Sequence, residues 1–227
     1  MKKAIVLVAC LSAVALVPAV SGAQVSKGLL RLSLDTRLIG FTATTVELDE
    51  SPHTETKLRT FELGLANPEF GMGIGYTVID GLVIGGRVGL RFSSTSNETE
   101  DSDELKTRTF GLQILPYLEY AFNLGKKVVP FVAVVLGYEN TFSKDVNADA
   151  DGEPYYKTVT NQFEFGGGGG IHIFPAPVVS IDASLFAFGS FGKTVSTLDL
   201  GDGPSNDTDY KVRALRIAAY VGFSVWL

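Results

Sequence analysis

Residues 214–227 constrain the fold of this chain more than any other segment, because apolar and polar side chains alternate along their whole length. One face is apolar and consists of Leu215, Ile217, Ala219, Val221, Phe223, Val225 and Leu227. The other face is smaller and more polar and consists of Ala214, Arg216, Ala218, Tyr220, Gly222, Ser224 and Trp226. A repeat of two residues is that of a β-strand, and an alternation over about ten residues is typical of a strand that crosses a membrane.

Four residues of this segment also match a known terminal pattern. Tyr220, Gly222, Val225 and Leu227 follow the order polar or aromatic, x, Gly, x, x, apolar, x, apolar. In this the chain resembles the bacterial outer-membrane β-barrel family, whose last strand carries an assembly signal of this form. The family usually ends on Phe or Trp, whereas here Trp226 precedes a final Leu227. The resemblance implies a small OmpA/OmpX-like barrel in the outer membrane of a Gram-negative bacterium, inserted by the barrel-assembly machinery.

The first 23 residues have the features of a cleavable export signal. Lys2 and Lys3 precede the apolar run 4–17, and small residues at 21–23 suit cleavage before Gln24. The run is too short for a membrane-spanning helix. Cleavage as a lipoprotein at Cys10 is an alternative, although the apolar run continues past it. We predict a signal peptide at 1–23 and one barrel domain at 24–227.

The rest of the chain divides into eight strand-like segments. They are 29–46, 58–78, 82–93, 106–122, 128–142, 157–174, 178–192 and 210–227. Short connections that contain Gly or Pro lie at 80–81, 123–127 and 175–177. Long polar connections are centred on 48–57, 94–105, 143–156 and 193–209. The predicted fold is all-β: an eight-stranded antiparallel up-and-down transmembrane β-barrel with three short periplasmic turns and four longer extracellular loops.

Alternation alone does not say which face points inward. A soluble lipocalin-type barrel would place the apolar face inside, and a membrane barrel would place it outside. The terminal pattern, the glycines on the polar face and the aromatic residues near strand ends favour the membrane barrel. We expect an aromatic girdle of Phe61, Phe92, Phe110, Phe163 and Phe191 at the long-loop end, and another of Tyr76, Phe122, Phe131, Phe174 and Trp226 at the short-turn end.

The polar face carries charges of both signs. The predicted lumenal charge network consists of Arg31, Asp35, Arg37, Glu62, Arg87, Arg91, Glu119, Glu164, His172, Asp182 and Arg216. An isolated buried charge costs several kcal/mol, and side chains can fill the interior of eight strands. We therefore predict ion pairs that plug the lumen, with pairs that rearrange to open a narrow pore as the alternative.

Two irregularities interrupt the alternation. The apolar face changes parity across Asn67-Pro68, which predicts a β-bulge there. Residues 166–170 are all glycine and remove side chains from both faces. Because no helix pattern follows this run, we interpret it as a relief of packing inside the barrel and not as a phosphate-binding loop.

Other chemistry has little support in the sequence. His172 is expected to bond within the lumen and His53 to lie in a loop, and neither accompanies a nucleophile pattern, so we predict no enzyme activity and no cofactor. Asn147, Asp149 and Asp151 imitate the start of a calcium loop, but Thr158 stands where its closing Glu is needed. We predict no metal, with weak divalent-cation binding as an alternative.

The predicted function follows from these points. A net charge of −6 argues against nucleic-acid binding. We expect a monomer that contacts outer-membrane lipid and lipopolysaccharide and has a structural or surface-interaction role, with specificity for an unknown ligand in its acidic loops. The alternative is a narrow porin-like pore or a transport barrel for small apolar solutes.

Overall fold

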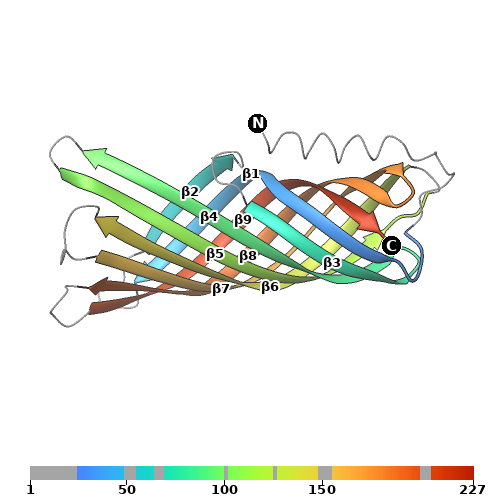
Figure 1. The fold of residues 1–227 in the computed structure, drawn as a ribbon. Helices are drawn as coiled ribbons and strands as arrows, with labels where there is room; N and C mark the ends of the chain where they lie inside the picture. The colour runs from blue at the N-terminus through green and yellow to red at the C-terminus, as the bar shows by residue number, and fades with distance from the viewer. Residues whose placement is uncertain are drawn as a thin grey trace, which may run out of the picture.

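Nine antiparallel strands form a ring in the computed structural model (Figure 1). The structure describes residues 25–48, 55–63, 69–99, 102–124, 127–147, 155–199 and 206–227. The strands are β1 (Leu30–Leu48), β2 (Glu55–Leu63), β3 (Glu69–Ile79), β4 (Leu82–Thr99), β5 (Ser102–Ala121), β6 (Val128–Asn147), β7 (Tyr155–Ala176), β8 (Val179–Asp199) and β9 (Asn206–Trp226). Each strand from β3 to β8 pairs with the next, and β1 pairs with β2, β3 and β9. The predicted antiparallel up-and-down barrel is confirmed.

The second predicted strand, 58–78, corresponds to two strands, β2 and β3. Both pair with β1: Leu63 lies opposite Ile39, and Phe70 lies opposite Thr36. The β2–β3 side therefore contains more residues than the facing part of β1. The predicted bulge at Asn67-Pro68 lies outside the described residues. Counted as two halves of one predicted strand, β2 and β3 reconcile nine strands with the expected eight.

The first short turn lies where the sequence predicts it, at residues 80–81, and its Gly81 has a φ of 83°, a conformation that favours glycine. The third lies at 177–178, slightly later than the predicted 175–177, because β7 continues to Ala176. The strands run further into the predicted loops than expected. β4 continues to Thr99 and β5 begins at Ser102, so most of the predicted loop 94–105 is a hairpin. Hydroxyl groups bond across strands in this half, as at Thr109–Ser143 (2.9 Å). Such polar residues suit a sheet that continues beyond the membrane.

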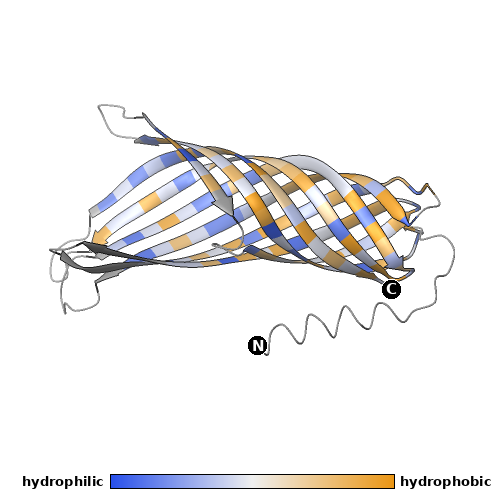
Figure 2. Cartoon of the chain, turned by 90° about the horizontal axis from the view of Figure 1, so that it is seen from above, coloured by the Kyte–Doolittle hydropathy of each residue, from blue (hydrophilic) through white to orange (hydrophobic). Residues whose placement is uncertain are grey.

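The apolar face points outward. Outward side chains such as Leu136 (67 % exposed) and Met72 (52 %) contrast with inward Arg37 (1 %) and His172 (0 %). Figure 2 shows the apolar residues concentrated toward the short-turn end and hydrophilic ones toward the long-loop end. This is the arrangement of a membrane barrel and the reverse of a lipocalin. No helix among the described residues is long and apolar enough to span a membrane.

A β-bulge in β1 was not predicted. Arg37 lies opposite Tyr220 and Ile39 opposite Ala219, so Leu38 is an extra residue in β1. Leu38 and Ile39 are consequently both exposed on the outer face. The bulge restores the inward position of the residues beyond it, beginning at Gly40.

The short-turn end of the lumen is filled by an apolar cluster. It consists of Val25, Val83, Ala121, Val129, Phe131, Ala133, Phe174 and Trp226. The expected girdle position of Phe131, Phe174 and Trp226 is therefore wrong, because these three side chains occupy inward positions of their strands and are buried. Tyr76 and Phe122 are exposed at this end, as a girdle requires.

Candidate functional site in the barrel lumen

The first group of charged residues, which we call the Arg31 cluster, contains Arg31, Glu119, His172 and Asp182. Nη1 of Arg31 donates hydrogen bonds to both carboxylate oxygens of Glu119 at 2.8 and 2.7 Å. Nη2 of Arg31 lies 3.5 Å from Oδ2 of Asp182. The four side chains come from β1, β5, β7 and β8, so the cluster connects opposite walls of the barrel.

His172 lies between the two acids of this cluster. Its Nδ1 is 2.7 Å from Oδ1 of Asp182, its direct cross-strand partner, and its Nε2 is 3.1 Å from Oε1 of Glu119. The hydroxyl groups of Ser180 and Ser224 donate to Asp182 at 2.7 and 2.5 Å. Both ring nitrogens of His172 thus face carboxylates, and neither is positioned to take a proton from a serine nucleophile.

The second group, the Arg87 cluster, lies nearer the long-loop end and balances four arginines with four acids. It contains Arg37, Arg87, Arg91, Arg216, Asp35, Glu69, Glu139 and Glu164, together with Gln113. Arg87 donates to Asp35 through Nη2 at 2.6 Å and through Nε at 3.0 Å. Gln113 connects Arg87 (2.9 Å) to Glu164 (2.5 Å). Nη2 of Arg216 donates to Glu164 at 3.2 Å.

Glu69 is the acid that several arginines of this cluster share. Its carboxylate lies 3.1 Å from Arg91, 3.4 Å from Arg37 and 3.7 Å from Arg87. A carboxylate buried among guanidinium groups recovers part of the large cost of its desolvation. Sequence reasoning did not include Glu69, Gln113 or Glu139 in the network, although Glu69 has the same parity as the inward glycines that follow it.

The structure brings ten of the eleven predicted network residues into these two clusters. The exception is Glu62, whose side chain lies outside the described residues. Glycines make room for the long side chains: a Cβ at Gly71 would collide with the guanidinium of Arg87, and one at Gly222 would crowd Asp35. Gly71 of β3 and Gly222 of β9 therefore have a packing reason to lack side chains.

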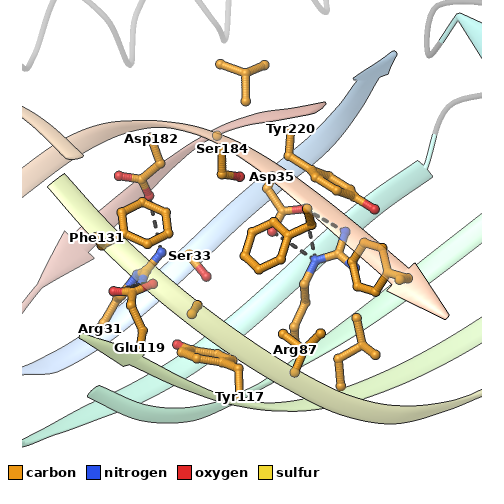
Figure 3. Close-up of a pocket in the computed structure, with 17 residues that line it drawn as sticks. Arg31, Ser33, Asp35, Arg87, Tyr117, Glu119, Phe131, Asp182, Ser184 and Tyr220 are labelled. Atoms are coloured by element: carbon orange, nitrogen blue, oxygen red, sulfur yellow. Dashed lines mark hydrogen bonds and ion pairs between the residues drawn. The ribbon is translucent and has the colours of Figure 1, made fainter. Parts of the chain in front are cut away.

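A small cavity separates the two clusters (Figure 3). Its volume is about 90 Å³, and Arg31 with Glu119 at one end and Arg87 with Asp35 at the other belong to its lining. This volume is below the ~150 Å³ of an engineered cavity known to bind benzene. The space is suited to groups no larger than a few water molecules.

Aromatic rings line one side of the cavity and occupy the space left by the glycine run of β7. A Cβ at Gly166, Gly168 or Gly170 would lie within 3 Å of a ring carbon of Phe188, Phe186 or Phe131, respectively. The sequence predicted free space at these glycines, but it did not identify the rings that fill it.

The terminal pattern residues lie in β9, the strand that closes the ring. Tyr220 and Gly222 line the cavity, whereas Leu227 is exposed on the outer side. The backbone of Leu227 bonds to Leu30 in both directions at 2.8 Å. Their role in assembly stays a prediction.

Apolar strand faces outside and paired charges inside define a transmembrane β-barrel. The family model of the outer membrane protein beta-barrel domain matches residues 6–224, and the chain belongs to this family. Membership implies the outer membrane of a Gram-negative bacterium. No curated protein matches the chain.

Several solved structures are similar to this chain. The outer membrane protein OprG from Pseudomonas aeruginosa has a TM-score of 0.54 and 11 % identity, over 89 % of this chain and 98 % of OprG. Neisserial surface protein A has a TM-score of 0.41 and 16 % identity, over 88 % and 99 %. Ail of Yersinia pestis has a TM-score of 0.39 and 14 % identity, also over 88 % and 99 %. At these identities the likeness concerns the fold alone.

Proposed function

We propose that this barrel has a closed lumen and serves a structural or surface-interaction role in the outer membrane. The observation that carries the proposal is the series of side-chain layers across the lumen. From the short-turn end these are the apolar cluster, the Arg31 cluster, the small cavity and the Arg87 cluster. A channel for hydrated solutes needs a continuous water-filled path through the lumen. The apolar cluster and the two charged clusters block such a path.

The chain just beyond the predicted cleavage site supports closure at the short-turn end. Val25 is fully buried in the apolar cluster. Its backbone N–H donates to Oδ1 of Asn123 at 2.9 Å, and its carbonyl accepts from Nδ2 of Asn123 at 3.0 Å. Removal of residues 1–23 would leave this segment at the start of the exported protein. There it would close the short-turn end of the lumen, held in place by its hydrogen bonds to Asn123.

The long-loop half supports a role at the cell surface. The strands extend well past the apolar band as polar hairpins, and a rigid scaffold that carries variable loops is a common basis of recognition. The calcium-like residues Asp149 and Asp151 lie outside the described residues. A surface ligand, a monomeric state and insertion by the barrel-assembly machinery belong to the proposal.

Liposome swelling tests the closed lumen. Vesicles that contain the refolded chain, residues 24–227, should swell in an isotonic pentose solution no faster than protein-free vesicles, because a cavity of about 90 Å³ offers no path for a sugar. A general porin reconstituted in parallel provides the positive control. Swelling at a rate that rises with the amount of inserted protein would contradict the proposal.

A second candidate function, passage of small apolar solutes, is favoured by the strand pairing. From Phe92 outward, β4 pairs with β5 alone, and β2 pairs with β1 alone among the described residues. Among the described residues, the outer part of β4 and β2 therefore have no strand pairing with each other, and this gap is a lateral opening in the outer half of the barrel wall. Faster uptake of an apolar dye by cells that carry the protein would favour this candidate, and unchanged uptake would contradict it.

A further inference from the structure

The four side chains of the Arg31 cluster form a closed ring of polar contacts. Arg31 lies between Glu119 and Asp182 (Figure 3), with Nη1 2.7 Å from Oε2 of Glu119 and Nη2 3.5 Å from Oδ2 of Asp182. His172 contacts the same two acids, with Nδ1 2.7 Å from Oδ1 of Asp182 and Nε2 3.1 Å from Oε1 of Glu119. A positive charge on His172 would make the signs alternate around the whole ring.

The charges of this cluster balance only with an additional positive charge. Arg31 supplies one positive charge and the two acids supply two negative charges, so one negative charge is in excess. Among the described residues, the ion pairs of Glu119 and Asp182 involve Arg31 and His172 alone. All four side chains are nearly or fully buried, and an uncompensated buried charge is costly. A second proton on His172 would bring the net charge of the cluster to zero.

Hydrogen bonding places that proton on His172 and not on an acid. A neutral imidazole has one nitrogen without hydrogen, which here would face a carboxylate oxygen, and neither atom could donate. Both oxygens of Glu119 accept from a guanidinium nitrogen, at 2.8 and 2.7 Å. The two oxygens of Asp182 accept from the hydroxyl groups of Ser180 and Ser224. Both acids are thus arranged as ionised acceptors, and both ring nitrogens of His172 are arranged as donors.

The aromatic rings around His172 also suit a cation. The ring of Phe131 is stacked on that of His172, with centroids 4.4 Å apart and planes at 17°. The rings of Trp226 and Phe174 lie at 5.5 and 6.3 Å. An aromatic face attracts a cation within about 6 Å, more strongly where water is excluded, and His172 is fully buried. The three rings belong to the apolar cluster, so the charge of His172 is coupled to the packing of the short-turn end.

The charged groups that face His172 come from three strands. Asp182 belongs to β8, Glu119 to β5 and Arg31 to β1. The phenol ring of Tyr117, also of β5, lies beside Arg31, with its centroid 6.0 Å from the guanidinium carbon. Arg31 repels an imidazolium, but each acid that contacts Arg31 also contacts His172. The nearest charges to both ring nitrogens are therefore negative.

We propose that His172 is held as an imidazolium and that its second proton keeps the short-turn end of the lumen closed. When base removes this proton, the cluster retains an uncompensated negative charge and becomes hydrated. The rings that pack on His172 then lose their charged partner, and the apolar cluster loosens. The short-turn end is closed at neutral pH and opens in alkaline solution. The effect on closure rests on the proposed closed lumen, whereas the charge of His172 does not.

Nitrogen NMR of the refolded chain, residues 24–227, with isotope-labelled histidine tests the charge directly. The chain contains two histidines, His53 and His172, so the variant His53→Gln leaves the ring signals of His172 alone. At pH 7 both ring nitrogens of His172 should give the signals of protonated nitrogen. One unprotonated ring nitrogen at pH 7 would overturn the proposal. A barrel that conducts ions at this pH would contradict the closed lumen and leave the NMR result intact.

The variant His172→Gln tests what the proton contributes to stability. At pH 7 its equilibrium constant of unfolding in urea should be at least about 100-fold larger than that of the unchanged protein, because two buried acids then share one arginine. The difference should shrink toward pH 10, because the unchanged protein loses the same proton as the pH rises. A difference that stays constant from pH 7 to pH 10 would overturn the proposal.

Quenching of Trp226 fluorescence by acrylamide measures the opening of the short-turn end. Trp226 is the single tryptophan and is buried against His172. In the unchanged protein, quenching should be weak at pH 7 and strong at pH 10, whereas in His172→Gln it should be strong at both. Equal quenching of the unchanged protein at the two pH values would contradict the opening.

Two further variants separate charge from packing. Tyr220→Phe removes a buried lumenal hydroxyl that has no hydrogen-bond partner, and it should change the equilibrium constant by less than about threefold. His172→Gln combined with Asp182→Asn leaves Arg31 paired with Glu119 alone, so it should recover at least about tenfold of the loss. No recovery would overturn the charge account. A requirement of the unchanged protein for sodium over choline would assign the missing charge to a metal ion and also overturn it.

Discussion

Replacing Arg31 by Gln lowers the free energy of unfolding by about 3–5 kcal/mol, the cost of leaving a buried partner charge uncompensated. Arg31 bonds to Glu119 at 2.7 Å and lies 3.5 Å from Asp182, and all three side chains are nearly buried. The measurement is urea unfolding of the vesicle-inserted protein, followed by the fluorescence of Trp226. This is the single tryptophan of the chain, and its ring centroid lies 5.2 Å from the guanidinium of Arg31.

Two further variants define the cause of that loss. Arg213→Gln removes an exposed arginine that lies 4.0 Å from Glu47, and it should cost less than about 1 kcal/mol. Arg31→Gln combined with Glu119→Gln should recover part of the lost stability, because the second change removes an uncompensated charge. Equal costs for Arg31→Gln and Arg213→Gln would contradict the buried ion-pair account.

Deletion of residues 223–227 should abolish insertion into the outer membrane. Phe223 pairs with Leu34 of β1 and with Ile181 of β8, so these residues join the two ends of the ring. Without them both neighbouring strands have unpaired backbone groups, each of which costs several kcal/mol in lipid. The truncated protein should accumulate in the periplasm and show no heat-dependent shift on a gel.

The single change Leu227→Ala is the control for this deletion. It removes an exposed side chain and keeps the backbone bonds between residue 227 and Leu30. This variant should insert into the outer membrane. The ratio of its insertion rate to that of the unchanged protein measures how much the side chain of Leu227 contributes to the assembly signal. Normal insertion of the truncated protein would contradict the role of β9 in closing the barrel.

The alternation of side chains was sufficient to predict the faces of most strands. Arg87, Arg91 and Glu119 lie inward as their parity requires, because a two-residue repeat leaves no third direction. The two-residue alternation did not predict the faces of β1 correctly across Leu38, where the strand contains one extra residue. Leu38 and Ile39 are consecutive apolar residues, and an apolar pair does not indicate which of the two is extra.

The sequence could not predict which charged residues meet. His172 and Asp182 are direct partners because they flank one short turn, and this pairing is local. Glu69 meets Arg91 on the neighbouring strand and Arg37 on β1, and these contacts depend on the registers of β1, β3 and β4 together. The inward position of Trp226 follows from parity, and the girdle prediction failed because it used aromatic character alone.

The most direct test of the closed lumen is the single-channel conductance of the refolded chain, residues 24–227, in a planar bilayer at neutral pH. Insertion is verified by the heat-dependent gel shift of the same sample. The two charged clusters and the apolar cluster predict a silent bilayer. Stable conductance steps that change in Arg87→Gln or Glu119→Gln would contradict the closed lumen and make transport through it the function of this barrel.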